Sequence, residues 1–346
     1  MSVEVYTDLD VIPADIASAL STRSGHAFFQ SIEWFRCLAK YGIDDGTPRV
    51  YVAQIEGSTQ CALYCLAQRR KLRSLTNFYT IEYGPVMNGP NADIGLKAIV
   101  SHISAERPRW DTIDFRNLQA ADLRALTESM GSSEFAMHTW DQYKNWFLDV
   151  ADRSFEQYYG QLSSKLRNTV ARKCRKAERE HDLRLTIYPA VGVSLDEAIT
   201  HFQKTYAESW KESEPFAEFM PSLFRICDEN GLARVGMAWL DGQPAATQLW
   251  ITDGNRSFIF KLAYDEKFKD LSIGSILSRA LFAHAIDTDH VTEVDYGVGD
   301  EPYKRDWMSG SRQLTGLMAC NRRTLRGQFA NLRQHLSSLK ASAQQS

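Results

Sequence analysis

The sequence predicts an α+β protein of two tandem domains, each a mixed, mostly antiparallel sheet with helices on its faces. Three observations support this fold class. The chain has 346 residues, which is more than one hydrophobic core usually organises. Each half contains the same order of strands, hairpin and helix, and an amphipathic helix connects the two halves. Two domains of similar architecture are therefore expected.

In the N-terminal half, the alternation of apolar and polar residues predicts strands that surround one helix. The first two strands flank Glu56-Gly57, a turn signal. The third strand is expected to end at glycine-proline pairs, and a helix and a short strand follow. The expected ranges are Arg49–Ile55, Cys61–Gln68, Phe78–Met87, the helix Asn91–Ala105 and the strand Thr112–Phe115.

The C-terminal half repeats this order about 185 residues later. Its hairpin is marked by Asp241-Gly242, one of the strongest short hairpin signals. A strand, a crossover helix and another strand then predict a βαβ unit attached to an antiparallel meander. Residue identity between the halves is weak, so two unrelated α/β domains with a common element order stay an alternative. The expected ranges are Ala233–Leu240, Ala245–Thr252, Arg256–Ala263, the helix Gly274–Ile286 and the strand Val291–Tyr296.

The segment Phe155–His181 between the halves predicts one amphipathic helix. Its apolar residues recur every three or four positions and cover an arc of about 120°. Most of its basic residues lie on the opposite face. Lys173 falls among the apolar residues and Arg167 at the border. Either these two side chains reach solvent, or they bind an anion of the substrate in a cleft between the halves.

The composition is that of a globular protein without a strong charge. Hydrophobic residues make up 44% and charged residues 24% of the chain, as in ordinary soluble domains. The net charge of −3 argues against a general nucleic-acid binder and leaves a local basic patch open. No signal peptide or membrane span is recognisable, so a cytoplasmic protein is expected. The six cysteines lack metal or disulfide spacing, so neither is expected.

The connection between the expected strand Arg256–Ala263 and the next helix is the first candidate site. Small residues there would let backbone N–H groups approach phosphate oxygens, and a helix N-terminus favours negative charge. An ordinary serine-glycine helix start is the alternative. The candidate donor-binding residues are Lys269, Ser272, Ile273, Gly274 and Ser275.

The end of the last strand is the second candidate site. Asp295 could take or relay a proton from an attacking amine, and Lys304 could stabilise the oxyanion that develops on the carbonyl. Tyr303 is the third candidate catalytic residue. A solvated turn, with Asp300 or Glu301 paired to a neighbouring cation, is the alternative. Arg167, Lys173, Tyr264 and Asp300 are expected to bind substrate.

Three segments carry a resemblance to a known family: SKLRNTVARKCRKAER, KLAYDEKFKDLSIGS and VDYGVGDEPYKRDW. They resemble the double-GNAT proteins typified by the CelD cellulose-biosynthesis acetyltransferases, which are similar to the Fem peptidoglycan aminoacyltransferases. The resemblance covers roughly residues 25–325, and the last segment is its most specific part. Ser272 departs from the family pattern, which has glycine there.

The resemblance implies that one half binds the acceptor and the other half binds the acyl donor. A degenerate acceptor-side GNAT domain would span 1–150, the connecting helix 151–185, and the acyl-donor GNAT domain 186–325. Residues 326–346 would form a basic, polar tail. The lysine that stabilises the transition state in Fem-type enzymes corresponds here to Lys304.

The expected function is N-acyl transfer from acyl-CoA, a co-substrate and not a bound cofactor, to an amine. The acceptor would be an amino sugar or a precursor of exopolysaccharide or cell envelope. One alternative is Fem-like aminoacyl transfer from tRNA to a peptidoglycan-type precursor, and another is an inactive scaffold in polysaccharide synthesis. No DNA partner is expected. Association with tRNA or a membrane surface, and the oligomeric state, stay open.

Overall fold

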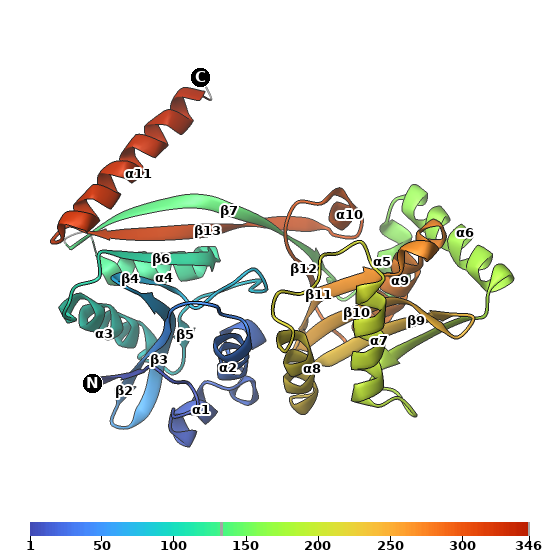
Figure 1. Cartoon of the computed structure of the whole chain (residues 1–346), viewed down its shortest axis with the longest axis horizontal. Coiled ribbons are helices and arrows are strands. Elements are labelled where there is room, and N and C mark those ends of the chain that lie inside the picture. The colour runs from blue at the N-terminus through green and yellow to red at the C-terminus, as the bar shows by residue number, and fades with distance from the viewer. Residues whose placement is uncertain (132–133, 345–346) are drawn as a thin grey trace. The chain divides into compact units, whose positions relative to one another are not determined.

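The computed structural model describes residues 1–131 and 134–344, with side chains up to residue 337. They form two compact units (Figure 1). Unit 1 comprises Met1–Tyr143 and Gln313–Ser346, and unit 2 comprises Lys144–Arg312. Unit 1 is therefore built from both ends of the chain.

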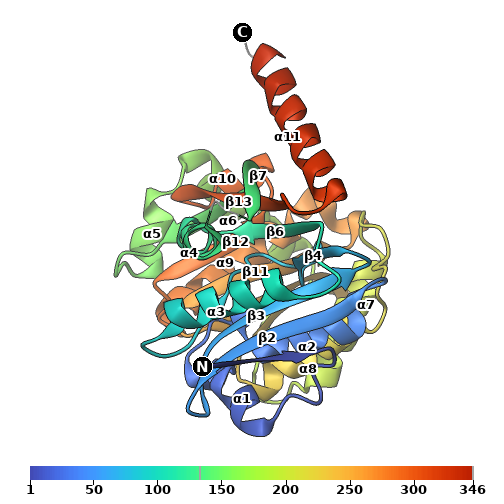
Figure 2. The same cartoon turned by 90° about the vertical axis from the view of Figure 1, so that its left-hand side faces the viewer.

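Unit 1 is a sheet with the strand order β1-β2-β3-β4-β6-β13. Neighbouring strands are antiparallel except β4 and β6, which are parallel. Helix α3 packs on β2 and β3 (Figure 2). The strands are β1 (Ser2–Tyr6), β2 (Thr47–Ile55), β3 (Ser58–Gln68), β4 (Lys71–Ser74), β5 (Val86–Met87), β6 (Thr112–Leu118) and β13 (Gly310–Asn321). The helices are α1 (Ala14–Ala19), α2 (Ile32–Tyr41), α3 (Ala92–Ala105), α4 (Ala120–Met130) and α11 (Leu325–Gln344).

Unit 2 has the corresponding strand order β8-β9-β10-β11-β12-β7. Again one neighbouring pair is parallel, β11 with β12. Helices α7 and α9 both pack on β9, β10 and β11. The strands are β7 (Phe135–Asp149), β8 (Leu183–Tyr188), β9 (Ala233–Leu240), β10 (Gln243–Asp253), β11 (Arg256–Tyr264) and β12 (Glu293–Val298). The helices are α5 (Phe155–Gln161), α6 (Ser164–Glu180), α7 (Leu195–Ala207), α8 (Phe219–Glu229), α9 (Ile273–Asp287) and α10 (Pro302–Arg305), with a 3₁₀ turn η3 (Glu266–Leu271) before α9.

The repeated order of elements confirms the predicted α+β class. The first half runs from β1 through α1, α2 and the β2–β3 hairpin to β7, and the second runs likewise from β8 to β13. The parallel pairs β4–β6 and β11–β12 are each joined by a crossover helix, as a βαβ unit requires. The last strand of each half pairs in the other unit, because β13 lies beside β6 and β7 beside β12.

This exchange of last strands changes the expected domain boundaries. The C-terminal unit ends at Arg312 and not at residue 325, since the following strand returns to unit 1. The residues expected as a tail form most of helix α11. The range 151–185 is also not a separate connector, because α5 and α6 pack with the core of unit 2.

Two predicted elements were wrong in detail. The third strand of unit 1 is β4, whereas the range Phe78–Met87 contains only the two-residue strand β5. Asn77 causes this, because its side chain accepts a hydrogen bond from the Tyr79 backbone N–H at 2.8 Å and so forms a turn. The range Phe155–His181 is two helices, because Leu162 is extended and Ser163 caps α6.

Candidate active site

Unit 2 contains a cavity of about 300 Å³ at the point where β11 and β12 separate. The two strands pair in parallel only from Arg256–Glu293 to Phe258–Asp295. Beyond that point β11 continues to Tyr264 and β12 to Val298. The side chains beyond the paired stretch form much of the wall. The lining residues are Trp210, Gln248, Leu262, Ala263, Tyr264, Lys269, Ser272, Ile273, Gly274, Ser275, Ser278, Tyr296, Tyr303 and Trp307.

The first turn of α9 forms one wall of this cavity. All five predicted donor-binding residues, from Lys269 to Ser275, line it. The first N–H groups of a helix have no partner within the helix, and they carry the positive end of its dipole. Lys269 is exposed and adds a cation next to them. This wall therefore favours an anion.

Ser272 explains how the chain enters α9 without the glycine of the family pattern. Its φ of 51° and ψ of 39° place it in the left-handed region, which costs a residue other than glycine roughly 1 kcal/mol. Its backbone N–H donates to the Lys269 carbonyl at 3.0 Å, which closes η3. The loop thus keeps the glycine-type conformation with a serine.

Gln248 on β10 fixes the start of α9 against the sheet. Its amide nitrogen donates to the Gly274 carbonyl at 3.0 Å and to the Ser278 hydroxyl at 2.8 Å. Its amide oxygen accepts a hydrogen bond from the Trp250 indole at 2.9 Å. Gly236 on β9 permits the close approach of α9, because a Cβ there would lie 2.6 Å from the Leu281 side chain. The first turn of α9 is therefore held rigidly.

Aromatic side chains form the adjoining wall, which meets the first turn of α9 where a Cβ at Gly274 would lie 3.5 Å from the Tyr264 ring. The rings of Tyr264 and Trp210 have centroids 4.4 Å apart, and those of Tyr296 and Tyr303 are 5.7 Å apart. Trp307 stacks on Phe282 at 5.0 Å. Burial and the nearby Glu301 carboxylate raise the pKa of Tyr303 to about 12. The Tyr303 hydroxyl is consequently protonated at neutral pH and available as a hydrogen-bond donor.

Lys304 is buried beside this aromatic wall and is not itself part of the cavity lining. Its ammonium group donates to the Val298 carbonyl at 2.5 Å and lies 2.9 Å from the Glu301 carboxylate. Burial acts to raise the pKa of Glu301, but the hydrogen bond and charge of Lys304 outweigh it and lower that pKa. The two side chains therefore form an ion pair at neutral pH.

Lys211 is a second lysine close to the cavity, and no sequence pattern marks it as a site residue. Burial lowers its pKa to about 8, with a further contribution from the charges of Lys261 and Lys304. Its ammonium group lies 5.6 Å from the centroid of the Trp210 ring, which lines the cavity. A neutral amine is thus populated near physiological pH, which makes Lys211 a candidate proton acceptor.

Asp295 lies outside the cavity, in a buried group of charges. Its carboxylate lies 2.7 Å from the Arg312 guanidinium and 3.4 Å from that of Arg256. It also accepts hydrogen bonds from the Asn145 amide and the Gly297 N–H, both at 2.7 Å. Only 1% of the residue is exposed. These contacts join β7, β11, β12 and the start of β13, which is a structural arrangement and not that of a proton relay to the cavity.

The remaining predicted substrate residues lie in different places. Tyr264 lines the cavity. Lys173 donates to the backbone carbonyl of Asp270 and so supports the donor loop from behind. Arg167 donates to the Leu162 carbonyl at 3.1 Å, within its own helix region. Asp300 is exposed and pairs with Lys144 at 3.3 Å. The last two are not among the residues that line the cavity.

Sequence reasoning missed several residues of the cavity. Tyr296 and Trp307 lie in the segment that carried the resemblance, so their proximity to Tyr303 was a usable signal. Gln248 is one of several polar residues of β10, so the sequence alone did not mark it as a residue of the cavity. Trp210 and Lys211 lie in a loop between α7 and α8, and only the fold brings them to the cavity.

In the part of the chain that the structure describes, no helix has the length and hydropathy needed to cross a membrane. Among the histidine, cysteine, aspartate and glutamate side chains of that part, no group of three or more is arranged to hold a metal ion.

Residues 164–305 match the model of an acetyltransferase (GNAT) domain. This range contains α6, α10 and all the residues that line the cavity except Trp307. A comparison with curated protein sequences finds no match. The sequence evidence for a GNAT domain therefore comes from unit 2.

Solved structures extend the similarity to nearly the whole chain. The C-terminal domain of an Agrobacterium fabrum protein assigned as a lysylphosphatidylglycerol synthetase is 12% identical with a TM-score of 0.57, and the match covers 90% of each chain. FemX is 11% identical with a TM-score of 0.55, covering 89% of this chain and 99% of its own. A tandem GNAT protein of clavulanic acid biosynthesis is 12% identical with a TM-score of 0.50, covering 91% and 98%. At these identities the similarity concerns the fold.

The chain therefore has the tandem GNAT-type acyltransferase fold. Its second unit carries a cavity at the separated parallel strands, and the lining of this cavity combines an anion-favouring helix N-terminus with tyrosines.

Proposed function

We propose that the protein is an N-acyltransferase that takes its acyl group from acyl-CoA. The observation that carries this proposal is the cavity in unit 2, which is lined by the first turn of α9 and Lys269. The pyrophosphate of coenzyme A would bind the N–H groups of Ile273 and Gly274. The pantetheine arm would lie between the separated ends of β11 and β12 and direct the thioester toward Tyr303.

The transfer needs an attacking amine, a base that accepts the proton of this amine, and an acid that gives a proton to the leaving thiolate. The amine nitrogen forms a bond with the thioester carbon, and the resulting oxyanion is stabilised by hydrogen-bond donors. The C–S bond then breaks, and the coenzyme A thiolate takes the proton of the Tyr303 hydroxyl. The amine proton passes to neutral Lys211, and the Lys211 ammonium then returns a proton to the Tyr303 oxygen, so that both residues end as they began. The buried Lys304–Glu301 pair positions Tyr303 and contributes positive charge near the oxyanion.

The acceptor class rests on the resemblance to the double-GNAT proteins of cellulose biosynthesis. We propose an amino sugar or another amine-bearing precursor of exopolysaccharide or cell envelope, modified in the cytoplasm. Acyl-CoA is preferred to aminoacyl-tRNA as donor, because Lys269 and the first turn of α9 suit a pyrophosphate group, and the net charge of −3 is unlike that of a general nucleic-acid binder.

Substitution of Gly274 tests the donor site. A Cβ at Gly274 would lie 3.5 Å from the Tyr264 ring, an ordinary contact, so the fold should tolerate Gly274→Val. The added methyl groups should occupy the space next to the first-turn N–H groups. We expect the affinity for acetyl-CoA, measured by calorimetry, to fall by roughly tenfold or more, which corresponds to about 1.4 kcal/mol.

Gly160→Val is the matched control. Gly160 lies in helix α5, and a Cβ there would meet no atom within 4 Å. This variant should bind acetyl-CoA like the unmodified protein. If Gly274→Val keeps its affinity while circular dichroism shows an intact fold, the assignment of the donor site is wrong.

A further inference from the structure

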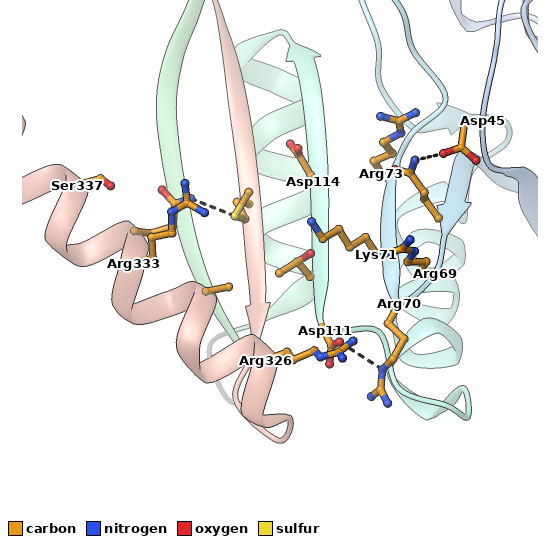
Figure 3. A pocket seen from close by; sticks show the side chains of 15 residues that line it. Asp45, Arg69, Arg70, Lys71, Arg73, Asp111, Asp114, Arg326, Arg333 and Ser337 are labelled. Carbon is orange, nitrogen blue, oxygen red and sulfur yellow. Dashed lines mark hydrogen bonds and ion pairs between the residues drawn. The ribbon is translucent and has the colours of Figure 1, made fainter.

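Unit 1 contains a second cavity, of about 780 Å³, which is lined by residues of β4, β6 and β13 and of α11 (Figure 3). It is separate in sequence from the candidate active site, since all of its lining residues belong to unit 1. Six of these residues are arginine or lysine and three are aspartate. The proposed acyl transfer gives this cavity no role.

This second cavity is the basic cavity, and its three aspartate carboxylates already have partners. Asp111 pairs with Arg70 at 3.3 Å, and Asp114 pairs with Arg116 at 3.1 Å. Asp45 accepts a hydrogen bond from the Gln68 amide. The other five cations of the lining form no ion pair with any residue that the structure describes; they are Arg69, Lys71, Arg73, Arg326 and Arg333.

The fold holds these five cations close to one another. Lys71 and Arg73 alternate on β4 with the buried residues Leu72 and Ser74, so both project from the same face, about 7 Å apart. Arg326 and Arg333 are two turns apart on α11, which places them on one side of that helix. Figure 3 shows Arg326 extending from α11 toward Asp111. Like charges in this arrangement repel one another unless an anion is present.

The side chain of Arg73 gives a second, independent indication that the basic cavity binds an anion. Its Nε atom is buried and has no hydrogen-bond partner among the described residues. A buried polar group without a partner costs free energy, and for a charged group the cost is larger. An anion in the basic cavity would supply the missing acceptor.

We propose that the basic cavity binds a phosphate-bearing ligand with at least two negative charges, such as a diphosphate group. Guanidinium groups bind phosphate oxygens in pairs, and four of the five free cations are arginines. The volume exceeds the needs of one phosphate and lies within the range of small-ligand sites.

The phosphate has two sources to distinguish, a soluble diphosphate and the headgroup of an anionic lipid. The exposed surface of α11 is relevant to the lipid headgroup. Four large apolar side chains are exposed there at spacings of four, three and four residues, and hence lie on one face. They are Leu325 (85% exposed), Phe329 (70%), Leu332 (56%) and Leu336 (54%). A lipid headgroup in the basic cavity would place acyl chains near this apolar row.

The experiment measures binding to the full chain in two arms. The first is calorimetry with inorganic pyrophosphate, and the second is co-sedimentation with vesicles that contain cardiolipin, whose headgroup carries two phosphates, with phosphatidylcholine vesicles as reference. The double variant Lys71→Gln/Arg73→Gln should weaken binding at least about tenfold, because it removes two charge-assisted contacts. The variant Arg326→Gln/Arg333→Gln removes the same charge from α11 and should act likewise, so the test does not depend on one variant.

The matched control is Lys97→Gln/Arg124→Gln, which removes two exposed cations of unit 1 outside the basic cavity. It should leave binding unchanged. Pyrophosphate binding that survives Phe329→Gln/Leu332→Gln identifies a soluble ligand. Vesicle binding that needs both the cations and the apolar row identifies a lipid headgroup. The proposal is overturned if neither probe binds, or if the control variant loses as much affinity as the cavity variants.

Acetyl-CoA affinity is measured on the same variants. It should not change, because the donor cavity shares no residue with the basic cavity. The two proposals can therefore fail independently.

Discussion

Lys304 combines a charged group with almost complete burial, since only 5% of the residue is exposed. Its contacts with Val298 and Glu301 fix its ammonium group beside the tyrosines of the cavity. If it contributes charge to the transition state, Lys304→Met should lower kcat by about 10²–10³. Steady-state kinetics and the calorimetric affinity for acetyl-CoA would separate this effect from donor binding, which should change little.

The neighbouring Arg305 supplies the control for Lys304. Its side chain is 64% exposed and lies 3.9 Å from Asp300, so Arg305→Gln should have almost no effect on turnover. A Lys304→Met variant with kcat within about threefold of the unmodified protein would limit Lys304 to a structural role.

Asp295 is a buried carboxylate whose contacts stabilise the fold, and we assign it no part in the proposed reaction. Removal of one partner from a buried ion pair leaves an uncompensated charge, which costs about 3–5 kcal/mol. Because Glu293 also pairs with Arg256 and Arg312, we expect Asp295→Asn to lower the free energy of unfolding by about 3 kcal/mol, the smaller end of that range. Urea denaturation measures this change.

Asp300→Asn serves as the comparison, because its exposed pair with Lys144 should contribute less than about 1 kcal/mol. The folded fraction of Asp295→Asn should bind acetyl-CoA normally. Unchanged stability together with a large loss of turnover would instead return Asp295 to the role of proton relay.

At the scale of elements, helix α6 shows what hydrophobic periodicity predicts correctly and what it does not. Its apolar residues pack against the core of unit 2, as the spacing predicted. Its start at Ser164 was not predicted, because helical periodicity continues through Leu162 and Ser163 while the backbone does not. A capping serine was the available signal: the Ser163 hydroxyl accepts from the Leu166 N–H at 3.2 Å.

The basic face of α6 tests the nature of the donor. On that face, Lys176 and Arg179 pair with Glu180, while Arg172 and Arg175 are exposed. An enzyme that uses acyl-CoA should keep its activity within about threefold when all four are replaced by alanine, whereas an RNA contact gives a steep salt dependence. Activity between about 50 and 200 mM salt is the measurement.

Lys173 and Arg167 stay unchanged in this variant, so the support of the donor loop by Lys173 is preserved. Near-complete loss of activity that low salt restores would favour aminoacyl-tRNA over acyl-CoA.

At the scale of the whole molecule, the exchange of last strands makes unit 1 depend on the C-terminal segment. β13 pairs with β6 from Thr315–Leu118 to Cys320–Thr112 and buries Leu314, Leu317 and Cys320 in unit 1. Truncation after Arg312 should therefore destabilise unit 1 by about 5 kcal/mol or more, given the apolar surface lost. Thermal denaturation and limited proteolysis of the two units would detect this.

Truncation after Thr324 is the matched control, because it removes α11 and keeps β13. The side chains of α11 are mostly exposed up to residue 337, so the melting temperature should fall by only a few degrees. If both truncations leave unit 1 equally resistant to protease, the C-terminal strand is not required for its fold.

Much of the site was accessible from sequence because it lies in one continuous segment. The loop from Lys269 to Ser275 and the pair Tyr303–Lys304 follow consecutive elements of one βαβ unit, so local patterns and turn residues located them. Gln248 and Trp210 come from other elements and reach the cavity only through packing. The side chain of Asp295 pairs with Arg312, which lies 17 positions along the chain on another strand, and no local pattern encodes that contact.

By itself, the sequence determined the α+β class and the repeated order of elements, and it predicted the loop that lines the cavity, because hydrophobic periodicity and turn chemistry act over a few residues. The tertiary structure decided which strands pair across the two halves, which carboxylate is buried in an ion pair, and where unpaired cations meet. Those features depend on contacts between different elements, and their free energies arise only when the chain is packed.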